Sequence, residues 1–276
     1  EVVAVIGGLS SIFAAVIACT QTDIKRILAF STMSQIGYMM LALGVSGYGA
    51  EAGLGFMASM FHLFTHAMFK ALLFLGAGAI IHAIHTNNLS EMGNLRKYMP
   101  ITHITFLIAC LAISGIPPFA GFFSKDEILV AAYNHNQIYF WVEWIVAGLT
   151  AFYMFRLYFG IFWGKEKKYE HTPHDAPFSM TFPLIFLAIA SAIVGFIPFS
   201  NFVTSDGFPF DIHIHWEIAL PSIGIALFGI IVAFVFYKKE SDLPSRAAAS
   251  FGSFYKYALN KFYFDELYLF VARKVI

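Results

Sequence analysis

The chain has 276 residues, of which 59% are hydrophobic and 12% are charged, and its 17 basic residues balance its 17 acidic ones. A soluble domain of this length carries far more charge, and a chain without net positive charge lacks the usual footprint of a nucleic-acid partner. Several apolar runs reach the roughly 18 residues that cross a bilayer core. The composition therefore predicts an all-α, polytopic membrane protein that contacts the lipid bilayer and no nucleic acid.

Seven membrane segments are predicted along the chain. In chain order they cover about 2–19, 27–45, 55–84, 101–133, 138–163, 178–199 and 217–237. The third and fourth segments are long for single spans, so each must tilt, project beyond the bilayer or break. From Ser245 onwards, apolar residues recur at helical spacing with lysines between them, which predicts an amphipathic helix on the membrane surface.

The distribution of basic residues predicts the orientation in the membrane. Fourteen of the seventeen lie in alternate loops or in the tail, and the three intervening loops contain neither Lys nor Arg. Loops rich in Lys and Arg face the cytoplasm. We therefore expect the start of the chain outside and its tail on the cytoplasmic side. The first residue is Glu1 and not Met, which indicates a fragment of a longer protein.

The fourth segment contains the sequence ISGIPPFAGFFSKDE, which does not suit a continuous helix. Pro117 and Pro118 interrupt the helical hydrogen bonds, and the part before them is too short to cross a bilayer. In transporters, such breaks mark ion sites near the midplane of the membrane. We expect an unwound stretch at about 115–121, shortly before Lys125. A simple proline kink without a transport role is the alternative.

A buried Lys125 requires a counter-charge. Its neighbours Asp126 and Glu127 point in other directions, because residues one or two positions apart do not share a helix face. Glu143 lies in the fifth segment at a similar predicted depth. The sequence therefore offers Glu143 as the candidate partner, with Asp126 and Glu127 as supporting acids.

The third segment carries ionisable residues inside the apolar stretch FHLFTHAMFK. His62, His66 and Lys70 are spaced at i, i+4 and i+8, so they form one stripe along a helix. A lysine at the centre of a membrane helix costs roughly 2.5–3.5 kcal/mol on insertion scales, so we expect the stripe to face protein and not lipid. Histidine exchanges protons near neutral pH, and a buried lysine approaches that range, which suits proton transfer. The pair of histidines predicts no metal site, because HLFTH lacks the Glu of HExxH and a third ligand on the same face.

Polar residues of the second segment extend this stripe into a possible path. Lys25 lies near the cytoplasmic end of that segment, where it also fits an ordinary interfacial lysine. Hydroxyl and amide side chains that can hold water follow it, namely Ser31, Thr32, Ser34 and Gln35. With Lys70 in the middle and Lys125 in the outer half, these residues predict a proton path across the membrane. A hydrogen-bonded packing network is the alternative.

Long stretches of the chain resemble one known family. The antiporter-like subunits of bacterial NADH:quinone oxidoreductase, respiratory complex I, contain sequences similar to TDIKRILAFSTMSQIGYM, FHLFTHAMFKALLFL, MGNLRKYMP and GIPPFAGFFSKDEIL, most closely in the subunit L family. The stretch NKFYFDELY near the end is also similar. The resemblance covers essentially the whole chain, and the family is related to multisubunit cation/proton antiporters.

The resemblance implies an arrangement in three parts. Residues 1–163 would form the second of two inverted five-helix repeats, residues 164–239 two additional spans, and residues 240–276 a cytoplasmic-side amphipathic segment leading to a lateral helix. It also implies that Lys70 is a central connecting lysine and that Lys125 is the lysine of the broken helix, facing the outer exit. Lys25, His62 and His66 match polar-axis positions, and the first repeat of the family is absent.

The same resemblance implies a function. It predicts a proton-translocating subunit in the bacterial inner membrane, whose partners are other membrane subunits, above all neighbouring antiporter-like subunits, together with protons and water. No cofactor is expected in this chain, since NADH, flavin, iron–sulfur clusters and quinone belong to partner subunits. A subunit of a sodium/proton antiporter and a silent membrane scaffold are the two alternatives.

Overall fold

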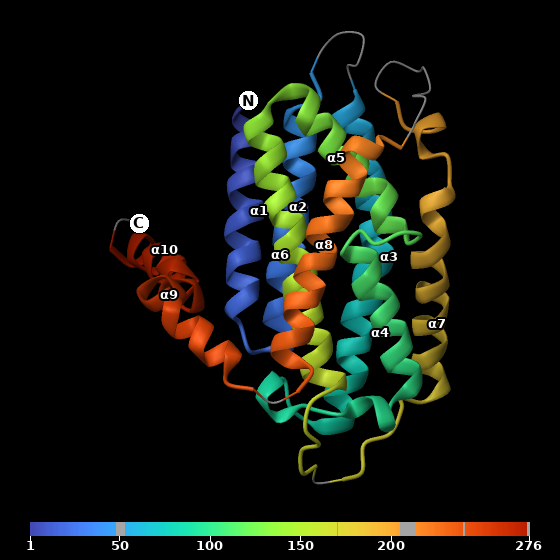
Figure 1. Cartoon of the computed structure of the whole chain (residues 1–276), viewed down its shortest axis with the longest axis vertical. Coiled ribbons are helices and arrows are strands. Elements are labelled where there is room, and N and C mark those ends of the chain that lie inside the picture. The colour runs from blue at the N-terminus through green and yellow to red at the C-terminus, as the bar shows by residue number, and fades with distance from the viewer. Residues whose placement is uncertain (48–52, 170, 205–213, 240, 275–276) are drawn as a thin grey trace.

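The computed structural model describes residues 1–47, 53–169, 171–204, 214–239 and 241–274, and within these ranges the regular structure is helical (Figure 1). Six of the described helices are long and apolar enough to cross a membrane. They are α1 (Val2–Thr20), α2 (Ile24–Gly44), α3 (Leu54–Ile84), α6 (Gln137–Phe162), α7 (Phe178–Ile193, continued by a 3-10 turn to Phe196) and α8 (Trp216–Tyr237). The prediction of an all-α, multi-pass membrane bundle is confirmed.

The remaining predicted span is broken, as the sequence indicated. It consists of α4 (Pro100–Ile113) and α5 (Ala120–His135), and the residues between them are not helical. Gly115 adopts a positive φ of 74°, which is unstrained for glycine, and Phe119 has extended backbone just before α5 begins. The unwound stretch is therefore residues 114–119 and not 115–121, because the helix resumes two residues earlier than expected.

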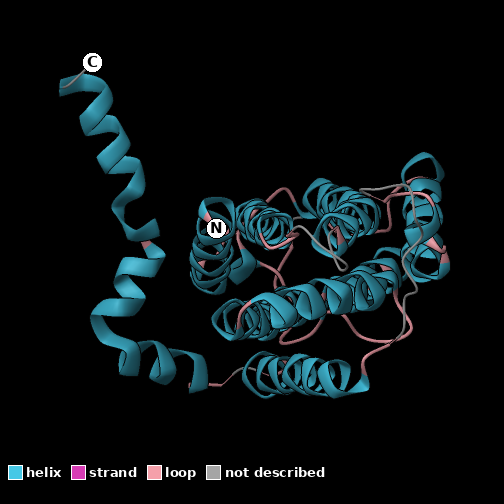
Figure 2. Ribbon diagram, turned by 90° about the horizontal axis from the view of Figure 1, so that it is seen from above, coloured by secondary structure: helices cyan, strands magenta, loops and turns pink. Residues whose placement is uncertain are grey.

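Shorter 3-10 turns complete the description of the chain. They are η1 (Leu89–Glu91), η2 (Leu95–Lys97), η3 (Val194–Phe196), η4 (Phe199–Asn201) and η5 (Lys261–Tyr263). In the bundle, α7 packs on α3 and α4, whereas α8 packs on α6. Seen from above, α1 to α8 form one bundle, and the tail helices extend away from it (Figure 2).

The helices α1 and α2 approach each other closely because small residues face the contact. A Cβ atom built on Gly7 would lie 2.4 Å from the Leu41 backbone nitrogen, and one built on Gly37 would lie 2.5 Å from the Ser11 nitrogen. Small residues allow this backbone approach, which is typical of helix pairs in membranes. The contact fixes the relative depth of the two helices, and with it the depth of the polar residues on α2.

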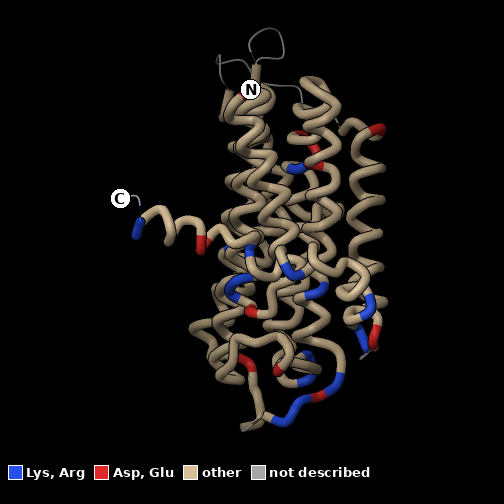
Figure 3. The backbone as a smooth tube through the Cα atoms, turned by 90° about the vertical axis from the view of Figure 1, so that its left-hand side faces the viewer, with Lys and Arg blue, Asp and Glu red and all other residues tan. Residues whose placement is uncertain are grey.

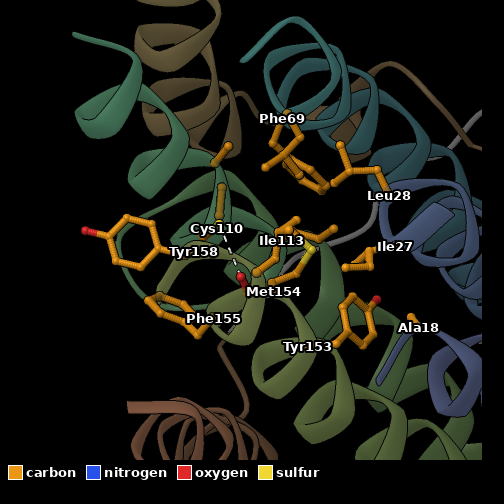
Figure 4. Close-up of a cluster of buried hydrophobic side chains, with 14 of the residues drawn as sticks. Ala18, Ile27, Leu28, Phe69, Cys110, Ile113, Tyr153, Met154, Phe155 and Tyr158 are labelled. Atoms are coloured by element: carbon orange, nitrogen blue, oxygen red, sulfur yellow. Dashed lines mark hydrogen bonds between the residues drawn. The ribbon is translucent and has the colours of Figure 1, made fainter. Parts of the chain in front are cut away.

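Apolar packing fills the centre of the bundle where α1, α2, α3, α4 and α6 meet (Figure 4). The labelled side chains of this cluster are Ala18, Ile27, Leu28, Phe69, Cys110, Ile113, Tyr153, Met154, Phe155 and Tyr158. All of them are buried, and the Cys110 thiol donates a long hydrogen bond of 3.8 Å to the Met154 carbonyl. The cluster holds α4 against α6 and so positions the break that follows α4.

The basic residues gather at one end of the bundle (Figure 3). Basic residues occupy the first turn of α2, the loops that join α3 to α4 and α6 to α7, and the residues directly after α8. We call this the basic end. The chain starts at the opposite end, which we call the N-terminal end (Figure 1). The sequence-based separation of basic and non-basic loops is therefore a separation in space.

The tail after α8 forms two further helices. It contains α9 (Leu243–Leu259), which bends at Gly252, and α10 (Phe264–Lys274). The ring of Phe13, well inside α1, contacts the rings of Phe262 and Phe264 at centroid distances of 5.3 and 6.0 Å. Aromatic side chains of the tail therefore pack against the side of α1.

The loop between α6 and α7 supplies the cap of α4. Asp175 accepts hydrogen bonds from the Ile101 and Thr102 backbone nitrogens at 2.8 and 3.2 Å, and from the Thr102 hydroxyl at 2.7 Å. It thereby satisfies donors that a helix start leaves free, although it lies far away in the sequence. The cap holds the basic end of α4 to the rest of the bundle.

Replacing Asp175 by Ala is expected to lower the free energy of unfolding by about 1–2 kcal/mol, the usual effect of losing a helix cap. The measurement is the midpoint of thermal unfolding of the full-length protein in detergent. Asp242→Ala is the matched control, because Asp242 precedes α9 without a capping hydrogen bond from its side chain. Equal midpoints for the two variants would contradict this role of Asp175.

Candidate functional site

The polar stripe on α3 faces the interior of the bundle, as predicted. His62, His66 and Lys70 are 0%, 6% and 5% exposed, although apolar residues of the same helix such as Leu63 are 48% exposed. The helix therefore turns Leu63 outward and these three ionisable side chains inward. Lys70 thus avoids contact with lipid. Its buried amino group in turn requires polar partners.

Lys70 finds its partner on α2. Its Nζ atom donates a hydrogen bond of 3.0 Å to the Leu28 carbonyl, which also accepts one of 3.0 Å from the Thr32 hydroxyl. The Phe74 ring lies 5.9 Å from the same nitrogen. The Leu28 carbonyl thus accepts hydrogen bonds from two side chains, but it carries no negative charge that would neutralise the Lys70 ammonium. Lys70 is therefore a buried cation tied to the helix that also carries the hydroxyl and amide residues.

His62 is the centre of a hydrogen-bonded network. Its Nδ1 lies 2.8 Å from the Ser124 hydroxyl, and its Nε2 lies 3.1 Å from the Gln35 side-chain oxygen. The Thr65 hydroxyl contacts the same Ser124 hydroxyl at 2.8 Å. The imidazole therefore connects α2, α3 and α5, at the point where α5 restarts after the break.

A second branch of the network runs through α6. The Gln35 amide nitrogen donates to the Thr150 hydroxyl at 3.4 Å. The Tyr153 hydroxyl contacts Thr150 at 3.3 Å and Ser31 at 3.1 Å. Polar side chains of α2, α3, α5 and α6 thus meet in the middle of an otherwise apolar bundle, and hydroxyl groups of this kind can both donate and accept hydrogen bonds.

Lys125 lies just after the break and is 4% exposed. Its Nζ has no hydrogen-bond partner among the described residues and lies 5.5 Å from the centre of the Tyr38 ring. Glu143 on α6 is near enough to interact electrostatically with this ammonium, although the described residues form no ion pair between the two. Glu143 is fully buried and accepts a 3.0 Å hydrogen bond from Ser11, while its second oxygen has no partner in the described part of the chain.

The two acids next to Lys125 are also inside the protein. Asp126 and Glu127 are each 5% exposed, and one oxygen of Asp126 lacks a hydrogen-bond partner among the described residues. Three buried carboxyl groups and one buried ammonium therefore lie in the half of the bundle nearer the N-terminal end. This half carries the higher density of unpaired polar atoms.

Other predicted residues lie away from this cluster. Lys25 is exposed at the basic end of α2. Thr32 and Ser34 bond to backbone carbonyls, of Leu28 and of Ser11, and not to the histidines. The two prolines, Pro117 and Pro118, are exposed in the break. The structure thus brings together Lys70, the histidines, Gln35, Ser31, Lys125, the acids and Glu143, but it leaves Lys25 outside the network.

Sequence reasoning missed several members of the network. They are Ser11, Tyr38, Thr65, Ser124, Thr150 and Tyr153. Each is a single hydroxyl residue in an apolar helix, which is common in membrane helices and carries no distinctive spacing. The available signals were the position of Ser124 directly before Lys125 and of Thr65 inside the histidine stripe.

Arg156 is the third basic residue within a span, and it serves a different purpose. It is 7% exposed on α6, and its guanidinium donates to the Ala18 carbonyl at 3.5 Å. Ala18 belongs to the last turn of α1, where helix carbonyls remain free and the helix dipole is negative. Arg156 therefore stabilises the end of α1 and lies apart from the histidine network.

The arrangement places proton-binding groups in a row without joining all of them by hydrogen bonds. His66 lies between Lys70 and His62, with its ring centre 6.0 Å from that of His62, and its Nε2 has no partner among the described atoms. The row therefore contains gaps on both sides of His62. Groups that bind protons but are not permanently connected suit stepwise transfer better than a rigid structural network.

Comparison with known proteins gives consistent results. Residues 1–150 match the family described as NADH:quinone oxidoreductase/Mrp antiporter, transmembrane. The NAD(P)H-quinone oxidoreductase chain 5 of Picosynechococcus sp. is 42% identical over 311 residues, which cover 97% of this chain and 46% of the relative. The NADH-quinone oxidoreductase subunit L of Rickettsia bellii is 39% identical over 297 residues, covering 100% of this chain and 45% of the relative. The chain thus spans about half the length of these relatives.

Two solved structures share the fold. A chain of the membrane-bound sulfane sulfur reductase, an archaeal respiratory membrane complex, matches with a TM-score of 0.69 and 30% identity, over 86% of this chain and 40% of that one. A chain of the Mrp complex from Dietzia sp. DQ12-45-1b matches with a TM-score of 0.68 and 22% identity, over 82% of this chain and 26% of that one. At that identity the second match speaks for the fold alone.

Proposed function

Because this chain belongs to the NADH:quinone oxidoreductase/Mrp antiporter transmembrane family, we propose that it is the proton-translocating half of a membrane subunit of NADH:quinone oxidoreductase. Relatives that carry that enzyme's name align with nearly the whole chain. In this proposal the chain contributes the proton path, and the redox centres belong to other subunits. Its partners are those subunits, in particular neighbouring antiporter-like ones.

One observation carries the proposal, namely the row of buried ionisable groups beside a broken helix. Lys70, His66 and His62 lead along α3 to the start of α5, where Lys125 and Glu143 follow. Burying each of these groups opposes folding, and a purely structural role would favour apolar residues in their place. Their retention inside one bundle supports a function that requires protons there.

The proposed direction follows from the charges of the loops. With the basic end in the cytoplasm, Lys70 receives a proton from that side, the histidines pass it on, and Lys125 with Glu143 releases it outside. Outward movement against the membrane potential costs about 2.3 kcal/mol per charge and 100 mV. Conformational change in partner subunits supplies this energy, since the proposal assigns no fuel-binding site to this chain.

A sodium/proton exchanger is the second candidate function. It is favoured by the family description, which includes the Mrp antiporters, and by the shared fold with a chain of the Mrp complex. A silent scaffold is the third possibility, but it leaves the buried lysines unexplained. The three functions make different predictions for transport in the assembled complex.

The full complex in sodium-free proteoliposomes is expected to move protons while NADH reduces quinone, and added sodium is expected to leave the number of protons per electron unchanged. The reason is that the proposed path runs through Lys and His side chains, which exchange protons. The measurement is the fluorescence of a trapped pH indicator, compared with and without a sodium gradient. Proton movement that requires sodium would favour the exchanger. A preparation whose proton count is unaffected by loss of both Lys70 and Lys125 would favour the scaffold.

A further inference from the structure

Tyr38 is a buried residue on α2 with contacts on both sides of a gap in the network. Its ring centre lies 5.5 Å from Lys125 Nζ and 6.0 Å from the centre of the His62 ring. The side chain is 0% exposed, and its hydroxyl has no hydrogen-bond partner among the described residues. A buried hydroxyl without a partner costs about 1–3 kcal/mol, so this position needs an explanation.

The charged and titratable groups around Tyr38 come from several helices. The His62 ring of α3 and the Lys125 ammonium of α5 contact its ring, and the buried acids Asp126 of α5 and Glu143 of α6 are near enough to influence it electrostatically. The two carboxyl groups act electrostatically on the Tyr38 hydroxyl. The ring is therefore attracted to the ammonium by a cation–π contact, while its hydroxyl lies within the field of the acids.

The hydrogen bonds of His62 do not themselves lead to Lys125. Its Nδ1 is engaged by Ser124 and its Nε2 by Gln35, and the described bonds of Gln35 continue into α6. Within the described part of the chain, Tyr38 is the side chain whose ring contacts both the His62 ring and the Lys125 ammonium. A route from the histidines to Lys125 therefore passes beside this phenol.

We propose that Tyr38 is a proton-relay residue that connects the histidine network to Lys125 and Glu143. Its ring holds the Lys125 ammonium, and a shift of the whole side chain brings its hydroxyl, which has no partner among the described residues, within hydrogen-bonding distance of groups across the gap. In each transfer the phenol oxygen gains a proton from the histidine side as its own proton leaves towards the lysine side. One O–H bond forms while another breaks, and Tyr38 ends unchanged. This inference rests on the proposed function.

Replacing Tyr38 by Phe tests the hydroxyl while keeping the ring. The assembled complex is expected to form and to retain quinone reduction, but to lose as many protons per electron as Lys125→Ala does. Tyr158→Phe is the matched control. Tyr158 is also buried, and its hydroxyl contacts His103 at 2.7 Å and Trp163 at 3.3 Å near the basic end, away from the histidine network. The control is expected to pump the normal number of protons per electron.

Incorporation of 3,5-difluorotyrosine at position 38 separates transfer from packing, because fluorination makes the phenol more acidic with little change in shape. The pH profile of pumping is expected to shift towards lower pH. Normal pumping by Tyr38→Phe, or an unshifted profile with difluorotyrosine, would overturn the inference. If complexes with Lys70→Ala and Lys125→Ala pump the normal number of protons, the proposed function itself is wrong. This result distinguishes a failure of the proposed function from a failure of the inference about Tyr38.

Discussion

Replacing Lys70 or Lys125 by Ala is expected to lower the number of protons pumped per electron, with the amount of assembled complex largely unchanged. Both side chains are almost completely buried, and a lysine at such a depth costs roughly 2.5–3.5 kcal/mol on insertion scales. Each alanine variant removes this cost of burying a lysine. The gain compensates for the loss of the Lys70–Leu28 hydrogen bond in one variant and of the charge near Glu143 in the other. The proton path, however, loses its middle in one variant and its outlet in the other.

The measurement is the ratio of protons to electrons in vesicles, together with the content of assembled complex. Lys97→Ala is the control, because Lys97 is an exposed loop residue whose side chain is 60% accessible and whose ion pair with Glu166 is at the surface. It removes a lysine without touching the bundle. A structural role for Lys70 or Lys125 would show itself differently, as reduced assembly with a normal ratio in whatever complex remains.

The second large effect is expected at Gly121, where α5 begins against the end of α4. A Cβ atom at this position would lie 1.9 Å from the Ala112 carbonyl oxygen and 2.8 Å from the Ala112 carbonyl carbon. Both contacts are with backbone, so a side-chain rotation cannot relieve them. Gly121→Ala is therefore expected to force the two half-helices apart, at a cost of about 1–3 kcal/mol or more.

The measurements for Gly121→Ala are the amount of assembled complex and its thermal unfolding. Gly78→Ala is the matched control, because Gly78 is also helical and a Cβ atom there meets nothing within 4 Å. The control is expected to be neutral or slightly stabilising, since Ala favours helix more than Gly does. If both variants assemble equally well, assembly does not depend on the close packing of α4 on α5.

The broken helix shows what the sequence could predict. Two adjacent prolines, a short preceding helix and a following lysine are local signals, and they located the break to within one residue at its start and two at its end. The inward orientation of His62 and Lys70 was equally predictable, because exposing them to lipid is costly. The predicted charge partner Glu143 is buried and acts on Lys125, although the structure shows no hydrogen bond to Lys125 Nζ among the described residues.

The missing parts of the prediction have a common physical cause. Tyr38 and Thr150 became recognisable only after α2 and α6 were packed together, because a single hydroxyl in an apolar helix has no periodic pattern. Lys25 shows the converse, since its position in the sequence suggested the start of a path but its side chain is exposed. The contact of the tail with Phe13 of α1 joins residues far apart in the sequence, and no local pattern contains it.

The central claim is that Lys70 and Lys125 carry protons and do not merely provide positive charge. Exchange of each lysine for arginine tests it most directly, because arginine keeps the charge but does not release its proton under physiological conditions. The measurement is the number of protons pumped per electron in proteoliposomes that contain equal amounts of assembled complex. We expect both Lys70→Arg and Lys125→Arg to lose proton pumping as the alanine variants do, and a normal ratio in both arginine variants would contradict the claim.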